Sequence, residues 1–376
     1  MRIGIVCYPT YGGSGVLATE LGKALADEGH QVHFITYQQP VRLNGFNPNI
    51  FYHEVQVPAY PLFDYPPYES ALSSTLVDVI LNHNLDLLHV HYAIPHASTA
   101  YMAKQILKKH GKHIPFITTL HGTDITLVGK DKTYAPVVTF SINESDAITA
   151  VSQNLRQETY KYFDIQKEIR VIYNFVDSKR FHRHRASSCG NALAPKGEKI
   201  LVHVSNFRPI KRVADAVLVF KKVWDKIPAK LLLIGDGPDR PAVESMCREL
   251  GICSDIRFIG KQEQLEEILG CADLFLLPSE YESFGLAALE AMASEVPVIS
   301  SNAGGLPEIN IQGKTGFLSP VGDVDGMADH ALTLLQNEEL LQQFRKQAYR
   351  QAKKFTLEQI IPQYEALYQE LIPQPV

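Results

Sequence analysis

Cysteine is scarce in this sequence. The chain of 376 residues contains five cysteines, none of them in a C-x-x-C pair. Paired spacing is typical of zinc knuckles, and a high cysteine content is typical of disulfide-linked secreted domains, so the sequence favours neither class. It predicts reduced thiols in the cytoplasm, at Cys7, Cys189, Cys247, Cys253 and Cys271.

Long hydrophobic runs and long basic runs are also missing. No stretch approaches the ~18 consecutive apolar residues of a membrane span, and the N-terminal MRIGIVCYP is too short for the apolar part of a signal peptide. Lys and Arg number 36 against 41 Asp and Glu, which gives a net charge of −5. This balance argues against nucleic acid or an anionic membrane as a partner, and it predicts a cytoplasmic protein.

The chain does contain a regular alternation of short apolar runs with amphipathic segments of helical length. Such alternation indicates βαβ units around parallel sheets, and hence an α/β fold. At ~150 residues per domain, the length is that of two domains. The apolar runs that we expect to form strands are residues 2–8, 31–37, 85–91, 115–121, 147–152, 199–205, 229–235, 255–260, 273–278 and 296–301.

A polar, basic segment rich in Gly, Ser and Pro interrupts this pattern at residues 174–198. We interpret it as the connection between an N-terminal domain (1–173) and a C-terminal domain (199–354). Each begins with a strand and a polar loop that opens a helix, which predicts two Rossmann-like, doubly wound domains facing one another across a cleft that binds ligand at the strands' carboxyl ends. Residues 355–376 carry an apolar helical stripe with an acidic opposite face, which favours packing on the body of the protein over membrane attachment.

The stretch SEYESFGLAALEAM (279–292) places Glu290 inside an apolar helix and Glu282 just before it. A buried carboxylate without a partner is costly, so a polar partner is expected. If Ser283 caps the helix, the next three residues offer free backbone N–H groups to a phosphate: Phe284, Gly285 and Leu286. An extended ligand would then place a sugar at Glu282, a diphosphate at the cap and ribose hydroxyls at Glu290, about two turns or ~10 Å along. Pairing of Glu290 with a core cation is the alternative.

Three polar loops follow other expected strands of the second half. The loop SNFRPIKR (205–212) holds Arg208 and Lys211, which can bind a diphosphate as a bidentate guanidinium and a point charge. GDGP (235–238) and GGLPE (304–308) follow two further strands. One such turn alone is unremarkable, but three at the carboxyl ends of one sheet predict a binding site.

In the first half, Gly13-Ser14-Gly15 formally matches the dinucleotide fingerprint G-x-G-x-x-A. A NAD site is disfavoured, because a four-residue loop precedes these glycines and the second expected strand ends without an acid for the ribose. A plain tight turn is one remaining interpretation. The other is a helix N-terminus whose N–H groups bind an anion.

Two patterns that imitate metal sites are not favoured. His89 and His91 point to the same side of a strand, and His96 follows, but no Cys or carboxylate nearby in the sequence completes a ligand set. We expect this strand to end in the cleft, where Tyr92 can donate a hydrogen bond. In Asp323-Val324-Asp325, the second aspartate is better interpreted as a helix N-cap than as part of a D-x-D metal motif. We therefore expect no metal.

Taken in order, the Glu282/Glu290 pair, the Ser-Phe-Gly between them, GDGP and GGLPE resemble the nucleotide-sugar domain of the retaining family-four glycosyltransferases of GT-B architecture. Residues 8–22, 89–103 and 119–126 resemble the first domain of the N-acetyl-α-D-glucosaminyl L-malate synthases of bacillithiol biosynthesis, so the likeness covers nearly the whole chain. The family usually has Arg five residues before the Lys, where this chain has Asn206. The synthases share the Asn-Phe-Arg form found here, and the role of Asn206 stays open.

The resemblance implies transfer of N-acetylglucosamine from UDP-GlcNAc to L-malate with retention at the anomeric carbon, without a metal or cofactor. The catalytic residues that it implies are His121, Glu282, Arg208 and Lys211. The donor site would comprise Gly13, Asn206, Arg208, Lys211, Glu282, Ser283, Phe284, Gly285, Leu286 and Glu290. Because malate is a dianion, the residues assigned to the acceptor, in the first domain, are hydrogen-bond donors and one cation: Gly13, Ser14, Tyr92, Thr123 and Arg42.

Three other functions stay open from the sequence. They are a UDP-GlcNAc 2-epimerase, a related transferase with a saccharide acceptor, and a sensor that binds UDP-GlcNAc without turnover. The sequence also leaves open the sugar epimer, the extent of domain closure and whether the chain forms a homo-oligomer.

Overall fold

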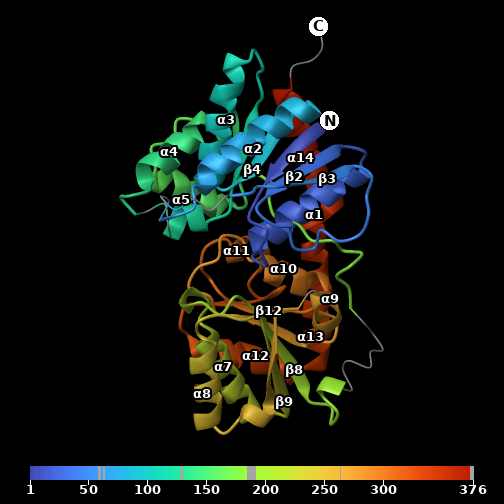
Figure 1. The fold of residues 1–376 in the computed structure, drawn as a ribbon. Helices are drawn as coiled ribbons and strands as arrows, with labels where there is room; N and C mark the ends of the chain where they lie inside the picture. Colours follow the sequence, from blue (N-terminus) through green and yellow to red (C-terminus); the bar gives the residue numbers. More distant parts are fainter. Residues whose placement is uncertain are drawn as a thin grey trace. The chain divides into compact units, whose positions relative to one another are not determined.

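The computed structural model describes residues 1–57, 61, 64–127, 129, 131–183, 192–262 and 264–372. The chain divides into two compact units (Figure 1). The first unit comprises Met1–Asn174 and Glu358–Val376, and the second comprises Phe175–Leu357. Residues 184–191 of the expected connection and the C-terminal residues 373–376 lie outside the described residues.

The first unit contains a parallel seven-stranded sheet in the order β3-β2-β1-β4-β5-β6-β7. The central strands β4 and β5 are buried along their whole length, as expected where helices cover both faces of a parallel sheet. The strand order reverses between β1 and β4, so ligand is expected at the carboxyl ends of these two strands. The strands are β1 (Arg2–Val6), β2 (Gln31–Thr36), β3 (Ile50–Glu54), β4 (Leu87–His91), β5 (Phe116–Leu120), β6 (Ala147–Ala150) and β7 (Ile169–Val171).

The C-terminal helix α14 (Leu357–Leu371) packs with the elements of the first unit, and Figure 1 shows it in red beside the blue strands. Its Tyr368 hydroxyl is hydrogen bonded to Nδ1 of His89 in β4 at 2.7 Å. The apolar stripe of this helix is therefore buried within one unit. The other helices of this unit are α1 (Gly13–Asp27), α2 (Tyr68–His83), α3 (Ser98–Lys109), α4 (Ala135–Glu144) and α5 (Gln153–Tyr162), with the short turns η1 (Ala93–Ala97) and η2 (Thr123–Leu127).

The second unit contains a parallel six-stranded sheet in the order β10-β9-β8-β11-β12-β13, and its order reverses between β8 and β11. Buried side chains of α7 and α12, among them Phe220 and Leu334, pack with strand residues in one hydrophobic core. The strands are β8 (Lys199–Val204), β9 (Ala229–Ile234), β10 (Ile256–Gly260), β11 (Leu274–Leu277), β12 (Val298–Ser301) and β13 (Gly316–Ser319). The helices are α7 (Val213–Trp224), α8 (Arg240–Glu249), α9 (Leu265–Leu269), α10 (Leu286–Ala293), α11 (Leu306–Ile309), α12 (Val324–Leu335) and α13 (Glu338–Ala352), with the turns η3 (Pro209–Lys211), η4 (Cys253–Asp255) and η5 (Lys353–Phe355).

The expectation of unpaired cysteines was wrong for one pair. Cys247 and Cys253 form a disulfide, with their Cα atoms 5.1 Å apart. Cys247 lies near the end of α8 and Cys253 opens η4, and the turn between them contains Gly251 with φ 70°. This turn folds the chain back within disulfide distance, which a search for C-x-x-C spacing does not detect.

The predicted cap of α12 was wrong by two residues. Asp323, not Asp325, is the N-cap, and its carboxylate accepts a hydrogen bond from the Gly326 N–H at 2.9 Å. Asp325 lies in the first helical turn and forms an ion pair with Lys222 of α7, with Nζ and Oδ1 2.6 Å apart. Both aspartates thus have structural roles.

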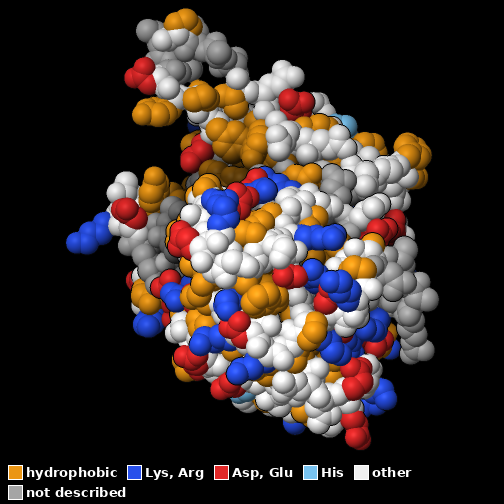
Figure 2. Space-filling view, turned by 90° about the horizontal axis from the view of Figure 1, so that it is seen from below, with side chains coloured by type: hydrophobic (Ala, Val, Ile, Leu, Met, Phe, Trp, Pro, Cys, Tyr) orange, Lys and Arg blue, Asp and Glu red, His pale blue; other side chains and the backbone are white. Residues whose placement is uncertain are grey.

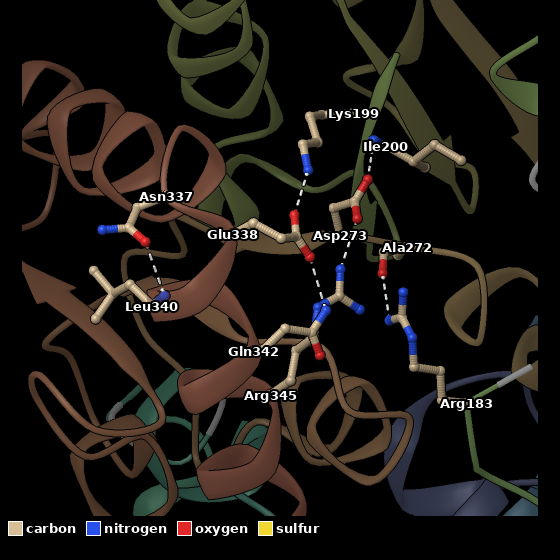
Figure 3. A network of polar contacts seen from close by, with 10 residues as sticks. All are labelled: Arg183, Lys199, Ile200, Ala272, Asp273, Asn337, Glu338, Leu340, Gln342 and Arg345. Atoms are coloured by element: carbon tan, nitrogen blue, oxygen red, sulfur yellow. Dashed lines mark hydrogen bonds and ion pairs between the residues drawn. The ribbon is translucent and has the colours of Figure 1, made fainter. Parts of the chain in front are cut away.

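An ion pair between the buried Arg345 and the half-buried Asp273 joins the amino-terminal ends of β8 and β11 to α13 (Figure 3). Asp273 accepts hydrogen bonds from the Ile200 N–H at 2.8 Å and from Nη2 of Arg345 at 2.6 Å. Burial raises the pKa of Asp273. The Arg345 side chain is 1% exposed, and its Nε and Nη1 atoms have no hydrogen-bond partner in the described part of the chain. The ion pair therefore fixes α13 against the starts of β8 and β11. The free energy that it contributes is reduced because the Arg345 guanidinium loses its hydration on burial.

Replacing Arg345 by Met should destabilise the second unit by up to about 3 kcal/mol, because the Asp273 carboxylate, which is only 18% exposed, loses its cation. The double variant Arg345→Met/Asp273→Asn should recover part of this loss. Lys199→Met is the matched control, because its ion pair with Glu338 is solvent-exposed and worth at most ~1 kcal/mol. Urea unfolding followed by circular dichroism measures all three, and an Arg345 variant as stable as the Lys199 variant would refute the assignment.

The surface carries both signs of charge. On the face shown in Figure 2, Lys and Arg side chains are interspersed with Asp and Glu, and no broad patch of a single sign is visible there. In the described ranges, no helix has both the length and the apolar character needed to cross a membrane.

Candidate active site

Four loops meet at the carboxyl ends of the strands of the second unit, where its strand order reverses. Backbone hydrogen bonds connect them: the Glu280 N–H donates to the Ile210 carbonyl at 2.8 Å, the Gly305 N–H to the Glu282 carbonyl at 2.8 Å, and the Asp239 N–H to the Phe207 carbonyl at 2.9 Å. The loops that follow β8, β9, β11 and β12 thus form one connected surface. This is the edge at which doubly wound sheets bind ligands.

Glycines make the close approach of these loops possible. A Cβ atom on Gly304, where φ is 61°, would lie 2.0 Å from the Glu282 carbonyl oxygen, and one on Gly237 would lie 2.0 Å from that of Asn206. No larger residue fits at either position. The GDGP and GGLPE motifs therefore hold the 205–212 and 279–285 loops against their neighbours.

Lys211 and Glu282 form an ion pair in this surface. Lys211 Nζ donates to Glu282 Oε1 at 2.6 Å, and the Ser279 hydroxyl donates to the same oxygen at 2.8 Å. The side chains are 20% and 14% exposed, so both remain accessible to a ligand. Two residues predicted from separate motifs, 71 positions apart, are brought together here.

His203 supports this loop and was not singled out from the sequence. Its Nδ1 donates to the Leu276 carbonyl at 2.9 Å, which leaves Nε2 to accept a hydrogen bond from the Ser205 hydroxyl at 2.8 Å. Burial is the main cause that lowers the pKa of His203 to about 4, and the charge of Lys211 contributes. The sequence did contain a sign of this role, because His203 is the only polar residue between the two ends of the run KILVHVS.

The expected helix cap at Ser283 was wrong. Helix α10 begins at Leu286, and its N-cap is Gly285, which has φ 95° and no side-chain cap. Only glycine adopts this backbone conformation readily, so the helix starts after it. The free N–H groups of the first turn accordingly belong to Leu286 and the two residues after it. Glu290 is 6% exposed in the second turn of the same helix.

Arg208 and Asn206 are exposed on either side of the fully buried Phe207. Phe207 has φ 40° and anchors the loop, so its neighbours project outward. Arg208 forms no ion pair with any residue that the structure describes. Its guanidinium is therefore available to an anion.

Three residues predicted to bind the acceptor meet in the first unit, after β1, β4 and β5. The Tyr92 hydroxyl donates to the Ser14 hydroxyl at 2.7 Å and is also hydrogen bonded to Thr123. Burial raises the pKa of Tyr92 to about 12, so it stays protonated at neutral pH. Gly13 and Ser14 are the first two residues of α1, as expected for an N-terminal binding site. Arg42 is placed beside Glu20 of α1, with Nη1 and Oε1 4.0 Å apart.

His121 lies next to this group, with its ring centroid 5.2 Å from that of Tyr92. Its Nε2 is hydrogen bonded to Nδ1 of His91 at 2.8 Å. Burial, with the nearby His96, lowers the pKa of His121 to about 3, so its ring is neutral at neutral pH. Asp124 holds the adjacent turn by accepting hydrogen bonds from the N–H groups of Ala93 and Gly122 at 2.8 and 3.1 Å. The His121 imidazole is therefore neutral at neutral pH and held in place by its hydrogen bond to His91.

The histidines considered as metal ligands make other contacts. His89 is hydrogen bonded to Tyr368 and Thr119, and His96 Nδ1 to the His91 carbonyl. These histidines are buried polar side chains next to His121, which is hydrogen bonded to His91.

Buried neutral histidines should make the fold acid-sensitive. Burial lowers the pKa of His89 to about 3 and of His96 to about 4, whereas in an unfolded chain both titrate near 6.5. Below about pH 6.5 the unfolded chain takes up protons that the folded chain does not, so stability is full above this pH and falls by ~1.4 kcal/mol per pH unit for each such histidine. The urea midpoint should therefore fall from about pH 7 to about pH 5. His89→Gln should reduce the slope, and an equal slope in both proteins would contradict this account.

Comparison with known proteins gives matches over both units. The model "Glycosyltransferase Family 4" matches residues 11–180, and "Glycosyl transferases group 1" matches 190–351. The N-acetyl-alpha-D-glucosaminyl L-malate synthase of Bacillus anthracis is 46% identical over 99% of this chain and 97% of its own length.

Two solved structures share the fold. Sucrose-phosphate synthase from Thermosynechococcus elongatus has a TM-score of 0.82 at 21% identity, covering 99% of each chain. Anabaena HepE in complex with UDP and glucose has a TM-score of 0.80 at 18% identity, covering 98% of this chain and 99% of its own. Both are GT-B glycosyltransferases built from two parallel-sheet α/β domains.

Proposed function

Because the chain belongs to the family-four glycosyltransferases of GT-B architecture, we propose that it transfers N-acetylglucosamine from UDP-GlcNAc to the hydroxyl group of L-malate, the first step of bacillithiol biosynthesis. Membership of this family makes it an enzyme, a hexosyltransferase. The choice of malate follows the name of the Bacillus anthracis relative. The geometric observation that best supports the reaction is the ion pair of Lys211 with Glu282, because it sets a cation for phosphate beside a carboxylate for sugar hydroxyls.

The second unit would bind the donor. Arg208, Lys211 and the free N–H groups at the start of α10 are donors and charges suited to a diphosphate, and they stabilise the negative charge that develops on the departing UDP. Glu282 would accept hydrogen bonds from the sugar, and Glu290, in the second turn of α10, from the ribose. These groups supply the electrostatic stabilisation without a metal or cofactor.

The first unit would bind malate. The Ser14, Tyr92 and Thr123 hydroxyls and the N–H groups at the start of α1 can donate to its carboxylates. Their mutual hydrogen bonds hold them in place before the ligand arrives. Arg42 is the least supported member of the predicted set, because its ion pair with Glu20 gives it a structural role.

The chemical step follows the family resemblance. The malate hydroxyl oxygen bonds to the anomeric carbon on the face from which the β-phosphate oxygen of UDP departs, and that phosphate oxygen takes the hydroxyl proton. His121 would orient the sugar at its anomeric carbon. Its lowered pKa keeps it neutral, so it adds no positive charge where the sugar becomes oxocarbenium-like.

Mass spectrometry of the products tests the function directly. The purified chain is incubated with UDP-GlcNAc and L-malate, with UDP-GlcNAc alone, and with UDP-GlcNAc plus a saccharide panel. GlcNAc-malate formed only in the first mixture supports the proposal. Epimerised UDP-sugar without an acceptor, or transfer to saccharides but not malate, would replace it with one of those activities. Binding of UDP-GlcNAc with no product in any mixture would indicate a sensor.

A further inference from the structure

Three histidines outside the transfer site converge in the first unit. They are His33 of β2, His53 of β3 and His83, the last residue of α2. One ring nitrogen from each lies within 4.8 Å of the other two, the only such group of potential metal ligands among the described residues. None of them belongs to the residues assigned to donor or acceptor.

The parallel register of the edge strand explains the convergence. His33 pairs with Phe51, and Ile35 pairs with His53, two register positions further along, so His33 and His53 project from the same face of the sheet. Helix α2 ends over this face with His83, whose ring centroid lies 4.8 Å from that of His33 and 4.9 Å from that of His53. Three separate elements thus direct imidazoles to one point.

Two of the ring nitrogens have nearly the spacing that a shared metal ion requires. Nδ1 of His33 lies 2.9 Å from Nε2 of His53, close to the ~3.4 Å separation of two nitrogens bound at ~2.1 Å to one tetrahedral ion. His33 is 1% exposed, and its Nε2 has no hydrogen-bond partner in the described part of the chain.

We propose that His33, His53 and His83 bind one divalent transition-metal ion of the zinc class, each through one ring nitrogen, with water at the remaining position. Three imidazoles and a water are an established zinc coordination set, and imidazole ligands favour Zn²⁺ over Mg²⁺ or Ca²⁺. The ion would attach the edge strand β3 to α2. None of the three ligands belongs to the residues assigned to the sugar transfer, which we expect to proceed without metal.

Isothermal titration of the untagged, full-length chain with Zn²⁺ tests the proposal. One ion should bind per chain, and the variants His53→Gln and His83→Gln should each lose at least about tenfold in affinity. His113→Gln is the matched control, because His113 is exposed and lies outside the group, and it should bind as the wild type does. His33 is left unchanged, because substitution of a buried strand residue could unfold the unit.

Thermal unfolding gives an independent readout. Zn²⁺ should raise the Tm of the wild type and of the His113 variant, because it binds only the folded site, and should raise it less in the His53 and His83 variants. Absence of Zn²⁺ binding to the wild type would overturn the proposal. So would equal affinity in the wild type and both site variants, which would leave the three rings as a hydrogen-bonded cluster alone.

Discussion

Replacing Lys211 by Ala lowers kcat for sugar transfer by roughly 100- to 1000-fold, the effect of removing one charge-stabilising donor from a transition state. The reason is that Lys211 is the cation held next to Glu282, on the loop after β8. Negative charge on UDP is greatest as the glycosidic bond breaks, so the loss should fall on kcat more than on the KM for UDP-GlcNAc. Steady-state rates at saturating malate give both constants.

Two variants control this measurement. Lys226→Ala removes an exposed lysine of the same unit and should leave kcat unchanged. Lys211→Arg keeps the positive charge and should retain more activity than the Ala variant. It should remain less active than the wild type, because a planar guanidinium and a compact ammonium group differ in geometry. An Ala variant that folds with the wild-type Tm and keeps its kcat would remove Lys211 from the mechanism.

Replacing Tyr92 by Phe raises the KM for malate by roughly 10- to 100-fold, the value of one hydrogen bond to a charged group. Ser14→Ala should act in the same direction, because the two hydroxyls are hydrogen bonded to each other at 2.7 Å. The KM for UDP-GlcNAc should change much less. The double variant should lose less than the product of the single losses, because the residues act as a unit.

Tyr134→Phe, at an exposed tyrosine of the same unit, is the control and should leave both KM values unchanged. Equal increases in the two KM values for Tyr92→Phe would show that the cluster does not select the acceptor. That result would mean that malate binds elsewhere than at Ser14 and Tyr92, and it would leave the assignment of the donor site unchanged.

The fold was predictable where strands are apolar and buried. All ten expected apolar runs contain a strand, because central parallel strands are covered on both faces and need continuous apolar sequence. The strands that were missed are short or at the edge. β3 (Ile50–Glu54) has no buried residue, β7 (Ile169–Val171) has three residues, and β13 (Gly316–Ser319) has four residues at the edge of its sheet, so none of them gives a clear apolar run.

The site was predictable as a set of loops but not in its local geometry. Placing polar motifs after parallel strands was enough to expect the loops of Lys211 and Glu282 in one site, whereas Tyr92 and Ser14 were grouped through the family resemblance. The start of α10 was misplaced because it depends on the positive φ of Gly285, which composition does not reveal. The histidine cluster was missed because it depends on the register of β2 and β3, which one sequence does not specify.

UDP binding to the second unit is the central claim, and isothermal titration of the full chain with UDP tests it most directly. The wild type should bind UDP, and Arg208→Glu/Lys211→Glu should reduce the affinity by at least about 100-fold, because two attractions become repulsions. Lys226→Glu/Arg257→Glu makes the same change in net charge at two exposed positions and should bind as the wild type does. Unchanged UDP affinity in the Arg208/Lys211 variant, or no affinity in the wild type, would contradict the account.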